Sequence, residues 1–185
     1  MRLKKRYETE ELYLCLSHRS LFRQVTAYYQ KNREFLKPFD PERDEIFYTS
    51  GYQYRLLIGD EAAQAEDTAY RFWIMEKADP TQVIGTVCLS GITRGAFLSS
   101  FLGYKLDKAH GGRGYMTQAV RKVTQIGFDL LGLHRIEANV MPRNTPSLRV
   151  LQKVGYREEG LAKDYLKING KWEDHIHMVL LNPKV

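Results

Sequence analysis

The sequence is poor in cysteine and contains no long hydrophobic run. Its two cysteines, Cys15 and Cys88, each lie in an apolar, strand-like stretch, which favours buried thiols over a disulfide framework and fits a reducing compartment. No apolar run is long enough to span a bilayer. The basic start, residues 1–6, leads into polar residues 7–11 instead of the apolar core of a signal peptide. These absences predict a soluble, cytoplasmic protein that does not contact membranes.

The chain also lacks repeats, low-complexity segments and linkers, which predicts a single domain over residues 1–185. Hydrophobic residues make up 43% and charged residues 27%, as in a globular protein with a sizeable core. The formal net charge of 28 − 22 = +6 favours acidic partners such as phosphorylated cofactors or a ribonucleoprotein surface. Because Lys and Arg form no dense patch or RNA-binding signature, no sequence-specific nucleic-acid binding is expected.

Hydrophobic periodicity predicts alternating strands and helices. Helices are expected from Leu21 to a stop at Pro38, over 42–66 as one broken helix with Gly51 and Gly59 as weak points, over 116–131 with Gly132 as C-cap, and over 145–154. Strands are expected at 12–16, 70–75, 83–89, 97–106, 136–140, 156–160, 165–168 and 172–181. Short turns predict antiparallel neighbours, whereas the helix between 97–106 and 136–140 predicts a parallel pair. The expected fold class is α+β, a mixed, mostly antiparallel sheet with helices on both faces.

A glycine-rich loop, residues 107–116, joins the strand ending at Leu106 to the helix beginning at Met116. Gly111, Gly112 and Gly114 free its backbone to turn sharply and to approach a ligand. The helix start that follows presents unpaired N–H groups and the positive end of the helix dipole. This arrangement predicts an anion cradle, most naturally for phosphate, with a simple β-to-α turn as the alternative.

Two motifs resemble those of the GNAT N-acetyltransferases. Gly103-Tyr104 followed by residues 110–119 looks like the family's acetyl-CoA pyrophosphate loop. Residues 144–156, which begin Asn-Thr-Pro-Ser and end Lys-Val-Gly-Tyr, resemble its second signature, an Asn-x-x-Ser helix start followed by Lys-x-Gly-Phe/Tyr. Ala109 and Gln118 depart from the family, which usually carries Gln or Arg at the first position and Glu at the second. Residues 32–38, 134–144, 159–166 and 170–175 extend the resemblance across the chain to the ribosomal-protein-alanine N-acetyltransferases of the RimJ/RimL branch, most of all to the RimJ type.

This resemblance implies the GNAT acyl-CoA N-acyltransferase fold and acetyl-CoA as cofactor. The strands 97–106 and 136–140 would form a central parallel pair that splays apart, so that the cofactor arm pairs with strand backbone as an extra strand would. Arg113 would add positive charge beside the phosphates, and the alternative is a solvated surface arginine. Asn144 would hydrogen-bond the cofactor arm, and the alternative is an ordinary cap residue. The implied cofactor-binding residues are Leu102, Gly103, Tyr104, Gly112, Arg113, Gly114, Tyr115, Met116, Thr117, Asn144 and Ser147.

The implied reaction transfers an acetyl group from a thioester to a primary amine, which needs a proton acceptor, an oxyanion donor and an acid for the leaving thiolate. Ser147 is the candidate general acid, or a plain helix-start serine. Asp164 matches the acidic position of RimL-like enzymes and ranks ahead of Glu137 as acceptor of the amine proton. Glu137 is alternatively a salt-bridged residue. Tyr104 and Tyr165 are candidate donors to the oxyanion or thiolate, or core tyrosines.

His175 and His177 share one face of the last predicted strand. No third ligand accompanies them at a recognisable spacing, so a structural or peptide-cleft role is favoured over a metal site, and no metal is expected.

Three functions follow from the resemblance. The first is direct acetylation, through a tetrahedral intermediate, of the N-terminal α-amino group of a ribosomal protein, with docking on the ribosome. The second keeps the chemistry but uses a small amine, such as an antibiotic or a polyamine, as acceptor. The third is a non-catalytic ribosome-assembly factor. The protein is expected to be a monomer or a homodimer.

Overall fold

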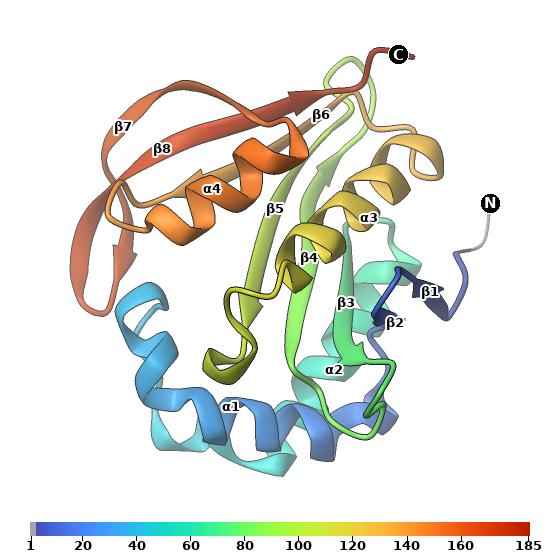
Figure 1. Ribbon diagram of the computed structural model, residues 1–185, viewed down its shortest axis with the longest axis vertical. Helices are drawn as coiled ribbons and strands as arrows, with labels where there is room; N and C mark the ends of the chain where they lie inside the picture. The colour runs from blue at the N-terminus through green and yellow to red at the C-terminus, as the bar shows by residue number, and fades with distance from the viewer. Residues whose placement is uncertain (1–2) are drawn as a thin grey trace.

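An eight-stranded sheet is the frame of the described chain. In the computed structural model, which describes residues 3–185, the strands lie in the order β1-β2-β3-β4-β5-β6-β8-β7 (Figure 1). Over these residues, every neighbouring pair is antiparallel except β5 and β6, which confirms the predicted mixed, mostly antiparallel sheet. Two residues of the predicted basic start, 1 and 2, lie outside the described residues. The strands are β1 (Arg6–Glu8), β2 (Leu12–Leu16), β3 (Ala69–Glu76), β4 (Gly85–Thr93), β5 (Ser99–Leu106), β6 (Arg135–Val140), β7 (Arg157–Ile168) and β8 (Lys171–Leu181).

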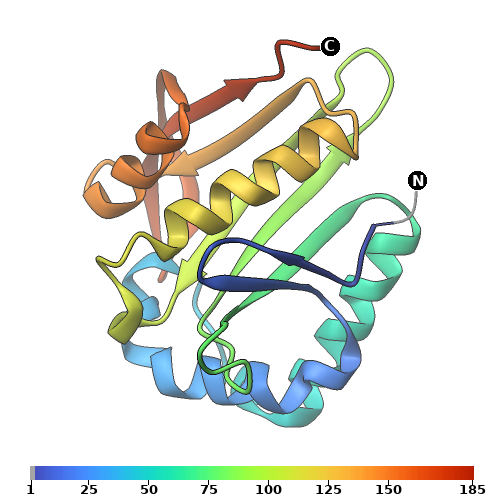
Figure 2. The same cartoon turned by 45° about the vertical axis from the view of Figure 1, so that its right-hand side comes forward.

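Helices cover both faces of the sheet, as predicted (Figures 1 and 2). Because successive strand residues point to opposite faces, Phe72 and Ile74 of β3 join one core cluster with Val123 of α3, whereas Trp73 and Met75 join the other with α1 and α2. No helix within residues 3–185 combines the length and hydropathy that a membrane crossing requires. The helices are α1 (Phe22–Leu36), α2 (Ser50–Ala65), α3 (Tyr115–Asp129) and α4 (Thr145–Val154), with short 3-10 helices η1 (Arg19–Leu21), η2 (Lys37–Phe39), η3 (Glu45–Tyr48) and η4 (Lys108–His110).

The broken helix predicted over 42–66 breaks at a different residue. η3 ends before Thr49, whose backbone is extended with φ −93° and ψ 147°. The Thr49 hydroxyl accepts the Tyr52 amide N–H at 3.4 Å and so caps α2. Gly51 and Gly59 lie inside the continuous α2, so the predicted glycine break is wrong. A glycine inside a helix costs only about 1 kcal/mol relative to alanine, so neither glycine ends α2.

Three smaller differences from the prediction concern one additional strand, the joining of two predicted strands, and the end of α3. β1 was missed, because three residues are too few to show a periodicity. The two strands predicted at 156–160 and 165–168 are one strand, β7, whose register against β8 shifts near Gly160 (φ +150°) and Asp164 (φ +46°). The C-cap of α3 is Leu130, and Gly132 adopts its left-handed φ of +64° two residues later.

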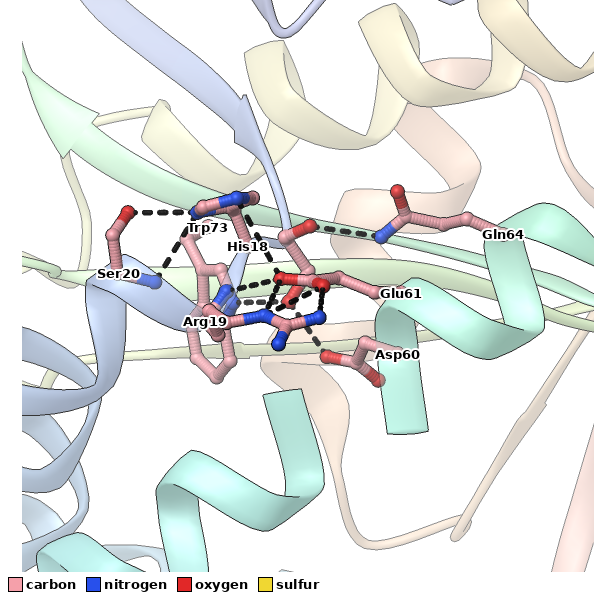
Figure 3. A network of polar contacts seen from close by, with 8 residues as sticks. His18, Arg19, Ser20, Asp60, Glu61, Gln64 and Trp73 are labelled. Carbon is pink, nitrogen blue, oxygen red and sulfur yellow. Dashed lines mark hydrogen bonds and ion pairs between the residues drawn. The ribbon is translucent and has the colours of Figure 1, made fainter. Parts of the chain in front are cut away.

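A polar network fixes α2 to the segment that follows β2 (Figure 3). Ser17 Oγ donates to Asp60 Oδ2 at 2.7 Å and accepts from Trp73 Nε1 at 3.0 Å. The Arg19 guanidinium pairs with the Glu61 carboxylate, with 2.9 Å between Nε and Oε2. These contacts join α2 to η1 and to Ser17, and through Ser17 to β3, so we regard the network as structural.

Candidate functional site

A cavity opens where β5 and β6 diverge. The two strands pair in parallel only over Ser99–Phe101 and Arg135–Glu137, although β5 continues to Leu106 and β6 to Val140. The predicted central parallel pair that splays apart is therefore confirmed. Past the last pairing lies a cavity of about 620 Å³, which is lined by β5, β6, the glycine loop, the first turns of α3 and α4, and parts of α1, η2 and β8.

The glycine loop forms one end of this cavity. Gly112 and Gly114 adopt left-handed φ values of +79° and +80°, which favour glycine, and a Cβ on either would meet no protein atom within 4 Å. Gly114 is the N-cap of α3, and the Gln118 amide donates to its carbonyl at 3.0 Å. The amides of Tyr115, Met116 and Thr117 precede this first helical hydrogen bond. They lie at the cavity-lining start of α3, where the helix dipole attracts anions.

Asp107 anchors the loop to α1. Its buried carboxylate accepts from Asn32 Nδ2 at 3.1 Å and from the Ala109 amide at 2.7 Å, and it lies 2.8 Å from Lys31 Nζ. Burial alone would raise the pKa of Asp107, but hydrogen bonds from Lys31, Asn32 and Ala109 lower this pKa to about 2. The Lys108 amide also donates to Asn32 Oδ1 at 3.2 Å. Sequence reasoning missed this anchor, although an Asp at the start of a turn is a known cap signal.

The start of α4 closes another side of the cavity. Asn144 is the N-cap of α4 and its side chain accepts the Ser147 amide N–H at 3.3 Å. The hydroxyls of Ser147 and Tyr104 lie 2.7 Å apart, and the Tyr104 hydroxyl also donates to the Ser147 carbonyl at 3.1 Å. Burial raises the pKa of Tyr104 well above its ordinary value, and the hydrogen bond with Ser147 offsets this only in part. Tyr104 therefore keeps its proton at neutral pH and remains a donor.

The sequence-predicted residues divide into two groups. Those that line the cavity are Leu102, Gly103, Tyr104, Gly112, Gly114, Tyr115, Met116, Thr117, Asn144 and Ser147. Of the described residues, Arg113, Glu137 and Asp164 do not line it. The Arg113 guanidinium points to Glu76, 3.5 Å from its carboxylate, and Asp164 is exposed on β7.

Glu137 is held in an ion-pair network on β6. Its carboxylate lies 2.8 Å from Arg135 Nη2 and accepts from His177 Nδ1 at 2.7 Å. Burial would raise the pKa of Glu137, but the hydrogen bonds from Arg135 and His177 lower it below its ordinary value. Glu137 is therefore a paired carboxylate, which was one of the two readings that the sequence left open.

Two further polar residues line the cavity: Asn139 on β6, which the sequence did not single out, and His175 on β8, for which the sequence favoured a structural or peptide-cleft role. Within residues 3–185, Asn139 Oδ1 is buried and has no hydrogen-bond partner. His175 is 3% exposed, and its Nδ1 lies 2.9 Å from the Glu173 carbonyl oxygen. Among the described residues, no group of three His, Cys, Asp or Glu side chains is arranged to hold a metal ion.

Comparison with known proteins identifies the family. Residues 17–157 match the model of the acetyltransferase (GNAT) domain. The chain is 46% identical over 153 residues to the probable N-acetyltransferase YjcK of Bacillus subtilis (strain 168), covering 83% of this chain and 84% of that protein. It is 36% identical over 181 residues to the ribosomal protein uS5-alanine N-acetyltransferase of Escherichia coli (strain K12), covering 97% of this chain and 92% of that protein.

Solved structures agree with this assignment. The ribosomal-protein-S5-alanine acetyltransferase of Vibrio fischeri superposes with a TM-score of 0.93 at 35% identity, covering 97% of this chain and 98% of that one. Mycobacterium smegmatis RimJ in complex with CoA-disulfide gives a TM-score of 0.88 at 28% identity, covering 94% of this chain and 83% of that one. The cradle of free amides and the gap between β5 and β6 fit a coenzyme A pyrophosphate and its arm. The chain belongs to the GNAT acetyltransferase family and is an acetyltransferase of the RimJ type.

Proposed function

We propose that the protein acetylates the N-terminal α-amino group of a ribosomal protein, with acetyl-CoA as the acetyl donor. One observation carries the proposal: a single cavity joins the glycine-loop amides to the partly buried Tyr104–Ser147 hydroxyl pair. The likeness to the uS5-alanine N-acetyltransferase over 97% of the chain supports a ribosomal-protein N-terminus as acceptor. The α-amine suits such chemistry because its pKa of about 7.7–8.0 lies well below the value of about 10.4 for lysine, so more of it is neutral near pH 7.

The cofactor would be held by backbone more than by side chains. We assign the pyrophosphate to the amides from Gly112 to Thr117, where the dipole of α3 adds attraction. From Leu102 to Tyr104, β5 pairs with β4 but not with β6, so its free edge can offer backbone groups to the cofactor arm. Asn144 lies beside this arm, although its side chain already caps α4. Arg113, paired with Glu76, would add no more than a peripheral charge.

When bound, acetyl-CoA supplies an acyl group activated as a thioester. Ser147 and Tyr104 are placed to give a proton to the departing sulfur, because their hydroxyls share a hydrogen bond at the cavity wall. Because burial raises the pKa of Tyr104, Tyr104 keeps its proton and can hold the Ser147 hydroxyl in place by hydrogen bonding. We therefore assign Ser147 as the acid and Tyr104 as the group that orients it.

The two carboxylates nominated from the sequence are less well situated. Asp164 is exposed, and Glu137 is paired with Arg135 and His177, so we infer that neither contacts the acceptor amine directly. Two acidic residues of β8 are also paired: Asp174 Oδ2 lies 2.7 Å from a lysine ammonium, and Glu173 pairs with an arginine.

The proposal is tested by incubating the protein with acetyl-CoA and three acceptor panels while following thiol release. The panels are peptides with free N-terminal Ala or Ser, N-terminally blocked peptides that contain lysine, and small amines that include polyamines and amino-sugar antibiotics. We expect release only with the first panel. Release only with small amines would overturn the proposed acceptor, and binding to ribosomes without release in any panel would overturn the enzyme assignment.

A further inference from the structure

One face of the β6–β8 half of the sheet is unusually polar. Along β6, Ile136 and Ala138 point into the α3 core, whereas Glu137 and Asn139 point to the opposite face. The α1–α2 core cluster packs on β2 and β3, at the other half of the sheet (Figure 2). This polar face therefore borders the cavity on the side opposite α3. When the cofactor occupies the α3 side, the polar side is left for the acceptor.

Two hydrogen-bond acceptors from this face line the cavity. Asn139 Nδ2 donates to the Tyr165 hydroxyl at 3.4 Å, which leaves Oδ1 buried and without a partner in the described chain. A carbonyl oxygen only accepts, so the contact between His175 Nδ1 and the Glu173 carbonyl fixes the proton of the neutral ring on Nδ1. His175 Nε2 is then a lone-pair acceptor on a side chain that lines the cavity.

A buried acceptor without a partner costs free energy, and native proteins rarely retain one unless a ligand or water satisfies it. An α-ammonium group carries three N–H donors, which matches two acceptors on one wall. We propose that Asn139 Oδ1 and His175 Nε2 receive the α-amino group of the acceptor and that His175 takes up its proton. This inference rests on the proposed function, which it deepens by naming the amine-binding residues.

The proton and electron balance is simple. An N–H bond of the ammonium breaks, its proton goes to His175 Nε2, and the electron pair stays on nitrogen as the lone pair that attacks the acetyl carbon. The bond from that carbon to sulfur breaks with its electrons on sulfur, which takes a proton from Ser147. The second proton lost by nitrogen replaces the one that Ser147 gave. The sum is one acetylated amine, one thiol and one proton, which His175 passes to solvent.

Several titratable groups surround His175, and the choice of the control variant depends on them. The Tyr165 ring of β7 lies 5.8 Å from the His175 ring, and His177 follows two residues later on the same face of β8. Asp174 is adjacent in sequence, and a hydrogen bond from Lys163 lowers its pKa, with a smaller contribution from His175. Among these, His177 is the best control, because it shares the strand, the face and the residue type but does not line the cavity.

The first test compares His175→Gln with His177→Gln. With an Ala-initiated peptide near pH 7, we expect His175→Gln to lower kcat/KM by about 100-fold, as loss of a general base does. The deficit should shrink to below about tenfold near pH 9, because an acceptor with a pKa of about 7.7–8.0 is then neutral without a base. His177→Gln should stay within about threefold, and both variants should bind CoA like the parent protein.

A deficit that does not change with pH, or an equal loss in both variants, would overturn the role of His175. Should His175→Gln fail to bind CoA, His175→Asn takes its place and is judged by the same pH dependence.

The second test measures binding without turnover. Asn139→Leu keeps the approximate shape of the side chain and removes Oδ1, together with the Nδ2 group that donates to Tyr165. In the presence of CoA, we expect it to weaken the binding of a free Ala-initiated peptide by about tenfold, the cost of losing a hydrogen bond to a charged group. The same peptide with an acetylated N-terminus is the matched control, and its binding should not change. Unchanged binding of the free peptide, or an equal loss for both peptides, would overturn the amine site.

If the parent protein acetylates only small amines, the proposed function is wrong. The roles of Asn139 and His175 can then still be tested with the small amine as acceptor.

Discussion

The anchor at Asp107 gives a prediction whose size follows from the structure. Its pKa of about 2 lies about two units below the ordinary Asp value of about 3.9, and one unit corresponds to about 1.36 kcal/mol. The full shift would be about 2.6 kcal/mol, but Lys31, one of its partners, is half exposed and screened by solvent. We therefore expect Asp107→Asn to lower the free energy of unfolding by about 2 kcal/mol at neutral pH.

The sign of the pH dependence follows from the direction of the shift. A carboxyl with a depressed folded-state pKa stabilises the fold above its unfolded pKa and loses that contribution as pH falls toward its folded pKa. Urea denaturation of the parent protein and Asp107→Asn should therefore show a gap that is constant from pH 7 to about pH 5 and narrows from about pH 4 toward pH 2.

The exposed pair of Asp129 with Lys184 supplies the control, and Asp129→Asn should change stability by less than about 0.5 kcal/mol. Because Asp107 orients the Ala109 amide and ties the glycine loop to α1, Asp107→Asn should also weaken CoA binding. A stability gap that is absent at pH 7, or that persists unchanged at low pH, would refute this account of the anchor.

Three further predictions concern the cavity wall. Ser147→Ala and Tyr104→Phe should each lower kcat by about 10- to 100-fold while the Kd for CoA, measured by calorimetry, changes less than about threefold; a larger change in Kd than in kcat would show that the hydroxyl pair serves binding. Gly114→Ala should cost about 1–2 kcal/mol in chemical denaturation, because its φ of +80° disfavours a Cβ, and an unchanged midpoint would contradict this reasoning. Asp164→Asn and Glu137→Gln should each lower kcat by less than tenfold, and a loss of 100-fold in either would restore that carboxylate as the base.

Local patterns were enough to predict the scaffold of the site. The glycines of the loop and the Asn144-to-Ser147 helix start are contiguous motifs, and both line the cavity. The divergence of β5 and β6 followed from the family resemblance and the crossover through α3. Features of this kind depend on neighbours in sequence, which periodicity and capping rules describe.

Contacts between distant segments escaped prediction. Asn32 and Asp107 are 75 positions apart, and no local rule pairs them. Asn139 and His175 come together only because β8 inserts beside β6, a strand order that alternation alone does not determine. The two histidines share one face of a strand, so the sequence alone does not tell which of them lies at the cavity. The structure shows that His175 lines the cavity and that His177 does not.

The most direct measurement of the central claim locates the acetyl group on a single substrate. A peptide that begins with alanine and carries an internal lysine is incubated with the protein and acetyl-CoA, and its fragments are read by tandem mass spectrometry. The account predicts acetylation at the α-amino group, an unmodified lysine, and a loss of about 100-fold in the initial rate with His175→Gln near pH 7. Acetylation at the lysine, or undiminished α-acetylation by His175→Gln, would contradict it.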